Sequence, residues 1–179
     1  MARTTPTAIW LMRLGFVGVA LVVVFFHLLP LNTLPVRWPP PDFLAALCFV
    51  WALRRPEFVP ALLIAVVMLL GDLLLQRPPG LWALLVLLAC EFLKVRMPPQ
   101  HETPFLGEWT TVAITLTIIT LINRLILGVL GVEQATLAPI LVQGIMTLIA
   151  YPFVVLISQS LLGVRRLTPA EIEAMGAHR

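Results

Sequence analysis

The sequence predicts an all-α integral membrane protein, a bundle of six transmembrane helices of which the second and fourth are short. Three observations lead to this fold class. Hydrophobic residues make up 60% of the 179 residues and charged residues only 12%, whereas a soluble domain carries roughly a quarter charged residues. The mean hydropathy is +0.99. Long apolar runs alternate with proline-containing gaps. Lipid is therefore expected to surround most of the chain.

The apolar runs differ in length. Crossing about 30 Å of hydrocarbon takes about 20 apolar residues. Three segments reach this length easily, one is slightly short, and two are shorter than a comfortable crossing; in chain order the six expected helices are 9–29, 42–55, 58–75, 80–95, 109–130 and 137–162. Because proline halts helices before it and favours the first turn of helices after it, the prolines between these segments mark the expected boundaries.

The expected domain organisation is one transmembrane domain, residues 1–167, followed by a short cytoplasmic tail, residues 168–179. No polar stretch is long enough to fold separately. In the tail, Thr168-Pro169-Ala170-Glu171 has the pattern of a capping box with proline at the first helical position, which predicts a short helix. The run after Arg13 lacks a small-x-small cleavage site, so an uncleaved first span is expected.

Positive charges predict the orientation. Cytoplasmic loops of membrane proteins carry an excess of Lys and Arg. With six spans and a cytoplasmic N-terminus, the outer side holds only Arg37 and Arg77, and Arg124 lies within a span. The cytoplasmic side then holds the other bases: Arg3, Arg13, Arg54, Arg55, Lys94, Arg96, Arg165, Arg166 and Arg179. If the second helix does not cross, a five-span arrangement with an outer N-terminus fits nearly as well. Both place the C-terminus in the cytoplasm.

Several function classes are disfavoured. The bases are scattered rather than gathered into a patch, so no nucleic acid is expected as partner. The three histidines, His27, His101 and His178, fall in different compartments and cannot share a metal. No nucleophile with a nearby base and no glycine-rich phosphate loop is found. Cys48 and Cys90 lie in apolar runs and are interpreted as small buried hydrophobes. We therefore expect neither an enzyme nor a cofactor.

A pattern in the middle of the chain carries a family resemblance. Arg55-Pro56-Glu57 opens a helix that ends near Gly71-Asp72, and Pro79-Gly80-Leu81 starts the next one. This order and spacing, over residues 54 to 93 of a chain of this length, resembles the rod shape-determining MreD family of Gram-negative bacteria. Arg55, Pro56, Gly71, Asp72 and Gly80 are the residues that match.

The resemblance implies a function. MreD-like proteins are non-catalytic scaffold or regulatory subunits of the cell-elongation complex, which builds peptidoglycan in the lateral wall. Their implied partners are an MreC-like protein, a RodA-type polymerase, a class B penicillin-binding protein, an MreB-like filament and membrane lipid. The implied location is the bacterial inner membrane, with both termini cytoplasmic. The family is also similar in fold to substrate-binding membrane subunits of vitamin-type transporters, so a substrate-capturing transporter subunit is the alternative.

Polar residues within the spans suggest a functional layer. A charge inside the bilayer costs about 2.5–3.5 kcal/mol on insertion scales, so it seeks a partner. Asp72 lies roughly 5 Å, and Arg124 and Gln143 roughly 9 Å, from the outer helix ends; Asn123 and His27 share this outer third. An Asp72–Arg124 ion pair, separate snorkelling of both charges to the headgroups, and a counter-charge from a partner protein all remain open.

Two further clusters have competing interpretations. The fifth segment carries a stripe of mostly small residues on one face, Thr110, Ala113, Thr117, Thr120 and Arg124. Packing inside the bundle is favoured there over a partner-binding face. On the inner side, four bases, Arg54, Arg55, Lys94 and Arg96, gather near Glu57 and Glu91. Topology determination with anionic-lipid contact is favoured there over a docking surface.

Aromatic residues add to the boundary predictions. Trp10, Trp51, Trp82 and Trp109 fall near predicted helix ends, where indoles prefer the headgroup region. Tyr151 does not fit this pattern, because it lies mid-helix beside Pro152. The proline predicts a kink in the last helix.

Overall fold

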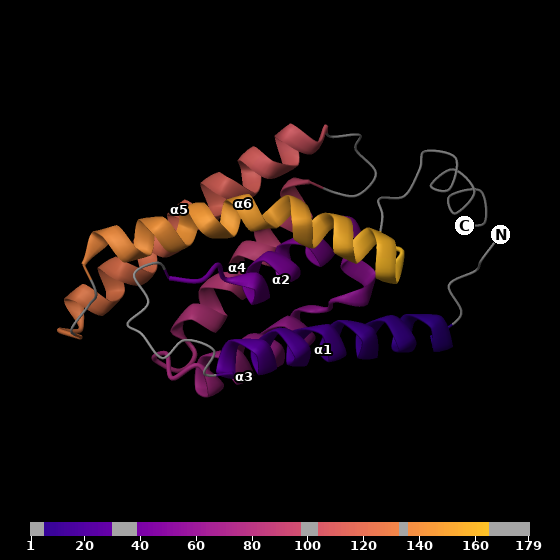
Figure 1. The fold of residues 1–179 in the computed structure, drawn as a ribbon, viewed down its shortest axis with the longest axis horizontal. Coiled ribbons are helices and arrows are strands. Elements are labelled where there is room, and N and C mark those ends of the chain that lie inside the picture. Colours follow the sequence, from indigo (N-terminus) through magenta and orange to yellow (C-terminus); the bar gives the residue numbers. More distant parts are fainter. Residues whose placement is uncertain (1–5, 30–38, 98–103, 133–135, 165–179) are drawn as a thin grey trace.

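The computed structural model describes residues 6–29, 39–97, 104–132 and 136–164, and within them it is all-helical (Figure 1). The tail 168–179 and its expected helix lie outside the described residues, as do His101, His178 and the bases at positions 3, 37, 165, 166 and 179. Six α-helices and one 3₁₀ turn follow in this order: α1 (Pro6–Leu28), α2 (Phe43–Arg54), η1 (Pro56–Phe58), α3 (Ala61–Leu74), α4 (Leu81–Arg96), α5 (Phe105–Val129) and α6 (Leu137–Leu162).

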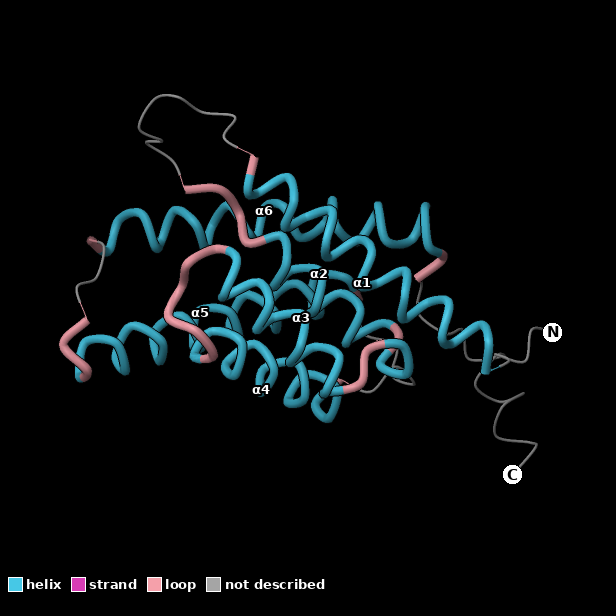
Figure 2. The backbone as a smooth tube through the Cα atoms, turned by 90° about the horizontal axis from the view of Figure 1, so that it is seen from below, coloured by secondary structure: helices cyan, strands magenta, loops and turns pink. Residues whose placement is uncertain are grey.

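The short helix α2 forms the centre of the molecule. Eleven of its 12 residues are buried, Leu44 through Arg54. It packs most extensively on α6 and α4 and also contacts α1 and α3, and Figure 2 shows it surrounded by other helices. A helix that is apolar all round is expected to be buried on all sides. At 1.5 Å per residue, α2 is about 18 Å long. Its neighbours, rather than α2 itself, form the outer surface of the bundle.

Helices α3 and α4 form a hairpin beside α2. Gly71 of α3 allows the close approach: a Cβ built there would lie 2.6 Å from Cδ2 of Leu44 in α2. The hairpin turn ends at Gly80, whose φ of +90° is in the left-handed region that favours glycine. Both glycines that match the family pattern therefore occupy positions that disfavour a side chain: Gly71 for lack of space and Gly80 for its backbone angle.

Three helices are long and apolar enough to cross a membrane: Thr7–Leu28, Phe105–Val129 and Leu137–Ser160. Only 17%, 22% and 28% of the residues in their most apolar windows are buried. Large apolar side chains such as Leu11, Leu125 and Leu141 are instead exposed. Water-soluble monomers rarely expose apolar patches beyond a few hundred Å², so these outward faces fit a helical membrane protein.

Trp109 explains how α6 accommodates Pro152. The proline has no backbone N–H, so the carbonyl of Leu148, four residues earlier, loses its helical donor. The indole Nε1 of Trp109 in α5 donates to that carbonyl oxygen at 3.0 Å. A polar group that lipid could not satisfy thereby gains a partner from the neighbouring helix.

The sequence pattern predicted that the indole of Trp51 lies at the headgroups, but the structure does not place it there. It is fully buried and donates to the hydroxyl of Ser158 in α6 at 3.3 Å. Its ring also packs in a tilted arrangement against Phe16 of α1, with ring centroids 5.2 Å apart. Cys48 and Cys90 are fully buried in the core, which agrees with their interpretation as small hydrophobes.

The stripe of α5 faces the bundle only in part: Ala113, Thr120 and Arg124 are half-buried, and Thr120 and Arg124 line a cavity between the helices. Thr110 and Thr117 are exposed, and their hydroxyls donate to carbonyls of their own helix. The buried face is rotated from the stripe and consists of Glu108, Val112, Thr115, Leu116 and Ile119.

Candidate functional site

The helices alternate in direction, so the bundle has two ends (Figure 1). At one end α2 begins and α3 and α5 finish; we call it the Asp42 end. At the other end α2 finishes, and α3 and α5 begin; we call it the Arg54 end. The start of α1 lies at the Arg54 end, because a guanidinium nitrogen of Arg13 donates to the carbonyl of Glu57 at 3.4 Å. The C-terminal part of α6 lies there too, through Ser158.

Asp42 organises the first of these ends. Its Oδ1 accepts from the backbone N–H of Ala45 at 3.0 Å, so it caps the N-terminus of α2. Its Oδ2 accepts from Nη1 of Arg77 at 2.8 Å and from the indole Nε1 of Trp82 at 3.1 Å. Its backbone N–H donates to the hydroxyl of Thr147 at 2.9 Å. One buried residue thus ties α2 and α4 together through its carboxylate and joins them to α6 through its backbone N–H.

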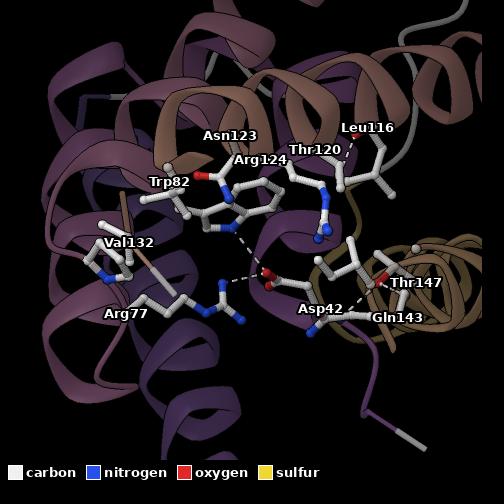
Figure 3. Close-up of a pocket in the computed structure, with 14 residues that line it drawn as sticks. Asp42, Arg77, Trp82, Leu116, Thr120, Asn123, Arg124, Val132, Gln143 and Thr147 are labelled. Atoms are coloured by element: carbon white, nitrogen blue, oxygen red, sulfur yellow. Dashed lines mark hydrogen bonds and ion pairs between the residues drawn. The ribbon is translucent and has the colours of Figure 1, made fainter. Parts of the chain in front are cut away.

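A partly open cavity of about 260 Å³ lies beside Asp42. Figure 3 shows the side chains of Arg77, Trp82, Arg124 and Gln143 around it. The cavity is lined from the ends of α2 and α4 and from α5 and α6. Three residues of the predicted polar layer line it, namely Asn123, Arg124 and Gln143. The amide nitrogen of Gln143 also donates to the carbonyl of Pro40 at 3.2 Å.

The predicted Asp72–Arg124 ion pair is not formed. Oδ2 of Asp72 instead accepts from the backbone N–H groups of Gly80 and Ala83, at 3.1 and 3.0 Å. Its Oδ1 has no hydrogen-bond partner among the described residues. Asp72 thus caps the first turn of α4 from the neighbouring helix α3, because a helix N-terminus offers unpaired N–H groups and a favourable dipole. Neither Asp72 nor His27 lines the cavity.

The Arg54 end holds a buried ion pair. Nε and Nη2 of Arg54 in α2 donate to Oε1 and Oε2 of Glu108 in α5 at 3.2 and 3.1 Å. The two side chains are only 6% and 1% exposed. The hydroxyl of Tyr151 in α6 donates to Oε1 of Glu108 at 2.6 Å. This two-pronged arginine–carboxylate geometry is the strongest form of ion pair, and it joins three helices.

The other charges of the expected inner cluster form local pairs. Nη1 of Arg55 lies 3.3 Å from Oε1 of Glu57. Nζ of Lys94 donates to Oε1 of Glu91 and to the carbonyl of Val59, both at 2.7 Å. Pro56 is the first residue of η1. The bond from Lys94 to the Val59 carbonyl holds α4 against the segment between α2 and α3, whereas Arg54 belongs to the buried pair described above rather than to this cluster.

Sequence reasoning missed Asp42, Arg77, Glu108 and the hydroxyl of Tyr151. A signal existed for three of them. Asp42 directly precedes an apolar run, which is where a capping residue occurs. Glu108 directly precedes the expected fifth helix, 109–130, and could have been matched to a base at the same end. The misfit of Tyr151 with the aromatic pattern was itself a signal, since a tyrosine hydroxyl in an apolar interior needs a partner.

Comparisons with known proteins give no relative: no protein-family model, no curated protein and no solved structure matches this chain. Among the described residues, no group of three or more His, Cys, Asp and Glu side chains is placed to hold a metal ion. The geometry of the two ends is thus the basis for the functional argument.

Proposed function

We propose that this chain is a non-catalytic scaffold or regulatory subunit of the bacterial cell-elongation complex, in the inner membrane. The observation that carries the proposal is the role of the residues that resemble the MreD family. Pro56 begins the turn between α2 and α3. Gly71 lets α3 approach α2. Asp72 and Gly80 fix the turn between α3 and α4. These residues join α2, α3 and α4 into one packed unit.

The exposed surface supports a scaffold. Around this packed unit, α1, α5 and α6 present apolar faces along most of their length. Such faces suit both lipid and the transmembrane helices of partners. On this proposal the partners are an MreC-like protein, a RodA-type polymerase, a class B penicillin-binding protein and an MreB-like filament.

The alternation of helix directions supports six crossings with both termini in the cytoplasm. The start of α1 and the C-terminal part of α6 lie at the Arg54 end, to which the positive-inside rule assigns the cytoplasm. The test is cysteine labelling with a membrane-impermeant reagent in intact cells. Arg96→Cys should be protected and Gln76→Cys labelled, because these exposed residues lie at opposite ends of α4 and α3. The reverse labelling pattern would mean that the chain has the opposite orientation in the membrane.

Co-purification tests the scaffold function. A tagged copy is expressed from the native locus, extracted in mild detergent, and probed for the MreC-like and RodA-type proteins. Recovery of these proteins is expected, together with rounding of rod-shaped cells when the chain is depleted. A Glu91→Gln variant, altered in a half-exposed surface pair, is the matched control and should co-purify normally. Depletion without a change of cell shape would exclude the proposal.

A second candidate is a substrate-capturing subunit of a vitamin-type transporter. The cavity at the Asp42 end favours it, because such a subunit needs a largely apolar cavity with a few placed polar groups. Thermal unfolding with a panel of vitamins separates the candidates. A specific rise in melting temperature with one vitamin would favour the transporter subunit, and none is expected for a scaffold.

A further inference from the structure

The hairpin of α3 and α4 is shorter than the hydrocarbon of an ordinary bilayer. The two helices have 14 and 16 residues, which makes them about 21 and 24 Å long at 1.5 Å per residue. The hydrocarbon core of a bilayer is about 30 Å thick. Because tilting a helix lowers its height across the bilayer, both lengths are upper limits. With six crossings, the hairpin therefore falls short by at least about 6 Å.

The last two helices do not share this deficit. α5 and α6 have 25 and 26 residues, or about 38 and 39 Å. Exposed apolar side chains on α5 run from Leu106 to Val129, roughly 35 Å along the helix axis. The end of α5 and the start of α6 extend beyond the turn between α3 and α4 (Figures 1 and 2). The bundle thus presents two different apolar heights to its surroundings.

The outer face of the hairpin consists mainly of large apolar side chains. They include Leu62, Val66 and Leu73 of α3 and Leu84, Leu88 and Phe92 of α4. The small residues Gly71, Ala83 and Ala89 are buried instead. Contacts between membrane helices favour small residues, which let two backbones approach closely. The outer face of the hairpin is therefore better suited to lipid chains than to a transmembrane helix of a partner.

Charged side chains are fixed at both ends of the hairpin. At the Arg54 end, Nζ of Lys94 donates to the carbonyl of Val59 at 2.7 Å. At the Asp42 end, Nη1 of Arg77 donates to Oδ2 of Asp42 at 2.8 Å. Because these bonds hold both cations against the protein, neither can extend freely toward more distant headgroups. Arg96 is exposed and can extend, but it acts at one end of the hairpin only.

We propose that the α3–α4 hairpin thins the bilayer beside it and binds lipids with shorter acyl chains than those that contact α5 and α6. A span shorter than the hydrocarbon is accommodated by thinning, by snorkelling of flanking residues or by oligomerisation. The fixed cations limit snorkelling, and the large side chains disfavour a close protein contact, so thinning is the response that fits. This lipid preference goes beyond the scaffold function, and it rests on the six crossings proposed with that function.

The test measures which lipids contact each face. The full-length protein, labelled with a fluorophore at one introduced cysteine, is reconstituted into mixtures of short-chain and long-chain phosphatidylcholine. One of the two lipids is brominated, and bromine quenches the fluorophore on contact. Leu88→Cys reports on the hairpin, and Ile118→Cys in the middle of α5 is the matched control. Both positions are exposed, whereas the native cysteines are buried.

The two positions should differ in lipid preference. At Leu88 the short-chain lipid should bind about twofold to tenfold more strongly than the long-chain lipid, because mismatch has a modest cost per ångström. At Ile118 the short-chain lipid should have no advantage. Val66→Cys on α3 is a second hairpin position, for use if Leu88→Cys does not fold, and should show the same preference as expected for Leu88.

The same preference on both faces would overturn the proposal. A hairpin label that no lipid quenches would also overturn it, because a second copy or another protein would then cover this face. The failure is distinguishable from failure of the scaffold function. Labelling with an impermeant reagent tests the crossings by themselves, co-purification can persist when both faces prefer the same lipid, and the lipid preference can persist in a chain that recruits no partner.

Discussion

The buried pair between Arg54 and Glu108 allows a prediction whose size follows from the structure. In Glu108→Gln the side chain keeps its volume and an oxygen that can accept from Tyr151, but it loses its charge. Arg54 is 5% exposed, and Glu108 is its only carboxylate partner among the described residues. Removing one member of a buried pair costs about 3–5 kcal/mol because the remaining charge is uncompensated.

The loss should be measurable by thermal unfolding in detergent micelles. For a chain of this size, 1 kcal/mol corresponds to about 2–4 °C, so the melting temperature should fall by roughly 6–20 °C. The matched control is Glu91→Gln, which removes an acid from the partly exposed pair with Lys94. Pairs of that kind contribute about 0–1 kcal/mol, so the control should shift by a few degrees at most.

A double variant separates charge from packing. Arg54→Met together with Glu108→Gln removes both charges, and a buried pair can often be replaced by uncharged residues at little cost. The double variant should therefore regain most of the stability that Glu108→Gln loses. If the two single effects simply add, or if Glu108→Gln behaves like the Glu91→Gln control, the reasoning from the buried charge is wrong.

Two further predictions test the helix contacts. Trp109→Phe should lower the free energy of unfolding by about 1–3 kcal/mol, because the carbonyl of Leu148 loses its donor; adding Pro152→Ala restores a backbone N–H and should recover much of this loss, and no recovery would mean that the indole contributes by packing alone. Gly71→Val should lower the melting temperature, because its Cβ would lie 2.6 Å from a neighbouring leucine methyl. Gly18→Ala, where a Cβ meets nothing within 4 Å, is the control, and an equal effect of both substitutions would refute the close-approach argument.

Several structural roles could be expected from local sequence. The all-round apolarity of residues 43–53 indicates a helix buried on every side, although the sequence alone left open how this short segment relates to the membrane. The left-handed conformation of Gly80 is a local property of the backbone. The close approach at Gly71 involves the side chain of Leu44 in another helix, so only the tertiary structure shows it.

The polar contacts were harder to predict. Depth along the helices correctly suggested that Asn123, Arg124 and Gln143 share one layer, and they line one cavity. Depth does not report rotation about a helix axis, so an Asp72–Arg124 ion pair stayed one of three open alternatives, whereas the structure shows that Asp72 caps α4. For the same reason Arg54 was counted among the bases of the cytoplasmic cluster, although its side chain points into the core and binds Glu108.

By itself the sequence determined that this protein is helical and that its outer faces suit lipid, because hydropathy and proline placement act through each segment separately. Only the tertiary structure decided which charges meet. Arg54 and Glu108 are 54 residues apart, and Asp42 and Thr147 are 105 apart. Such pairs depend on which helices are neighbours and how each is rotated, and these properties follow from packing of the whole bundle rather than from any one segment.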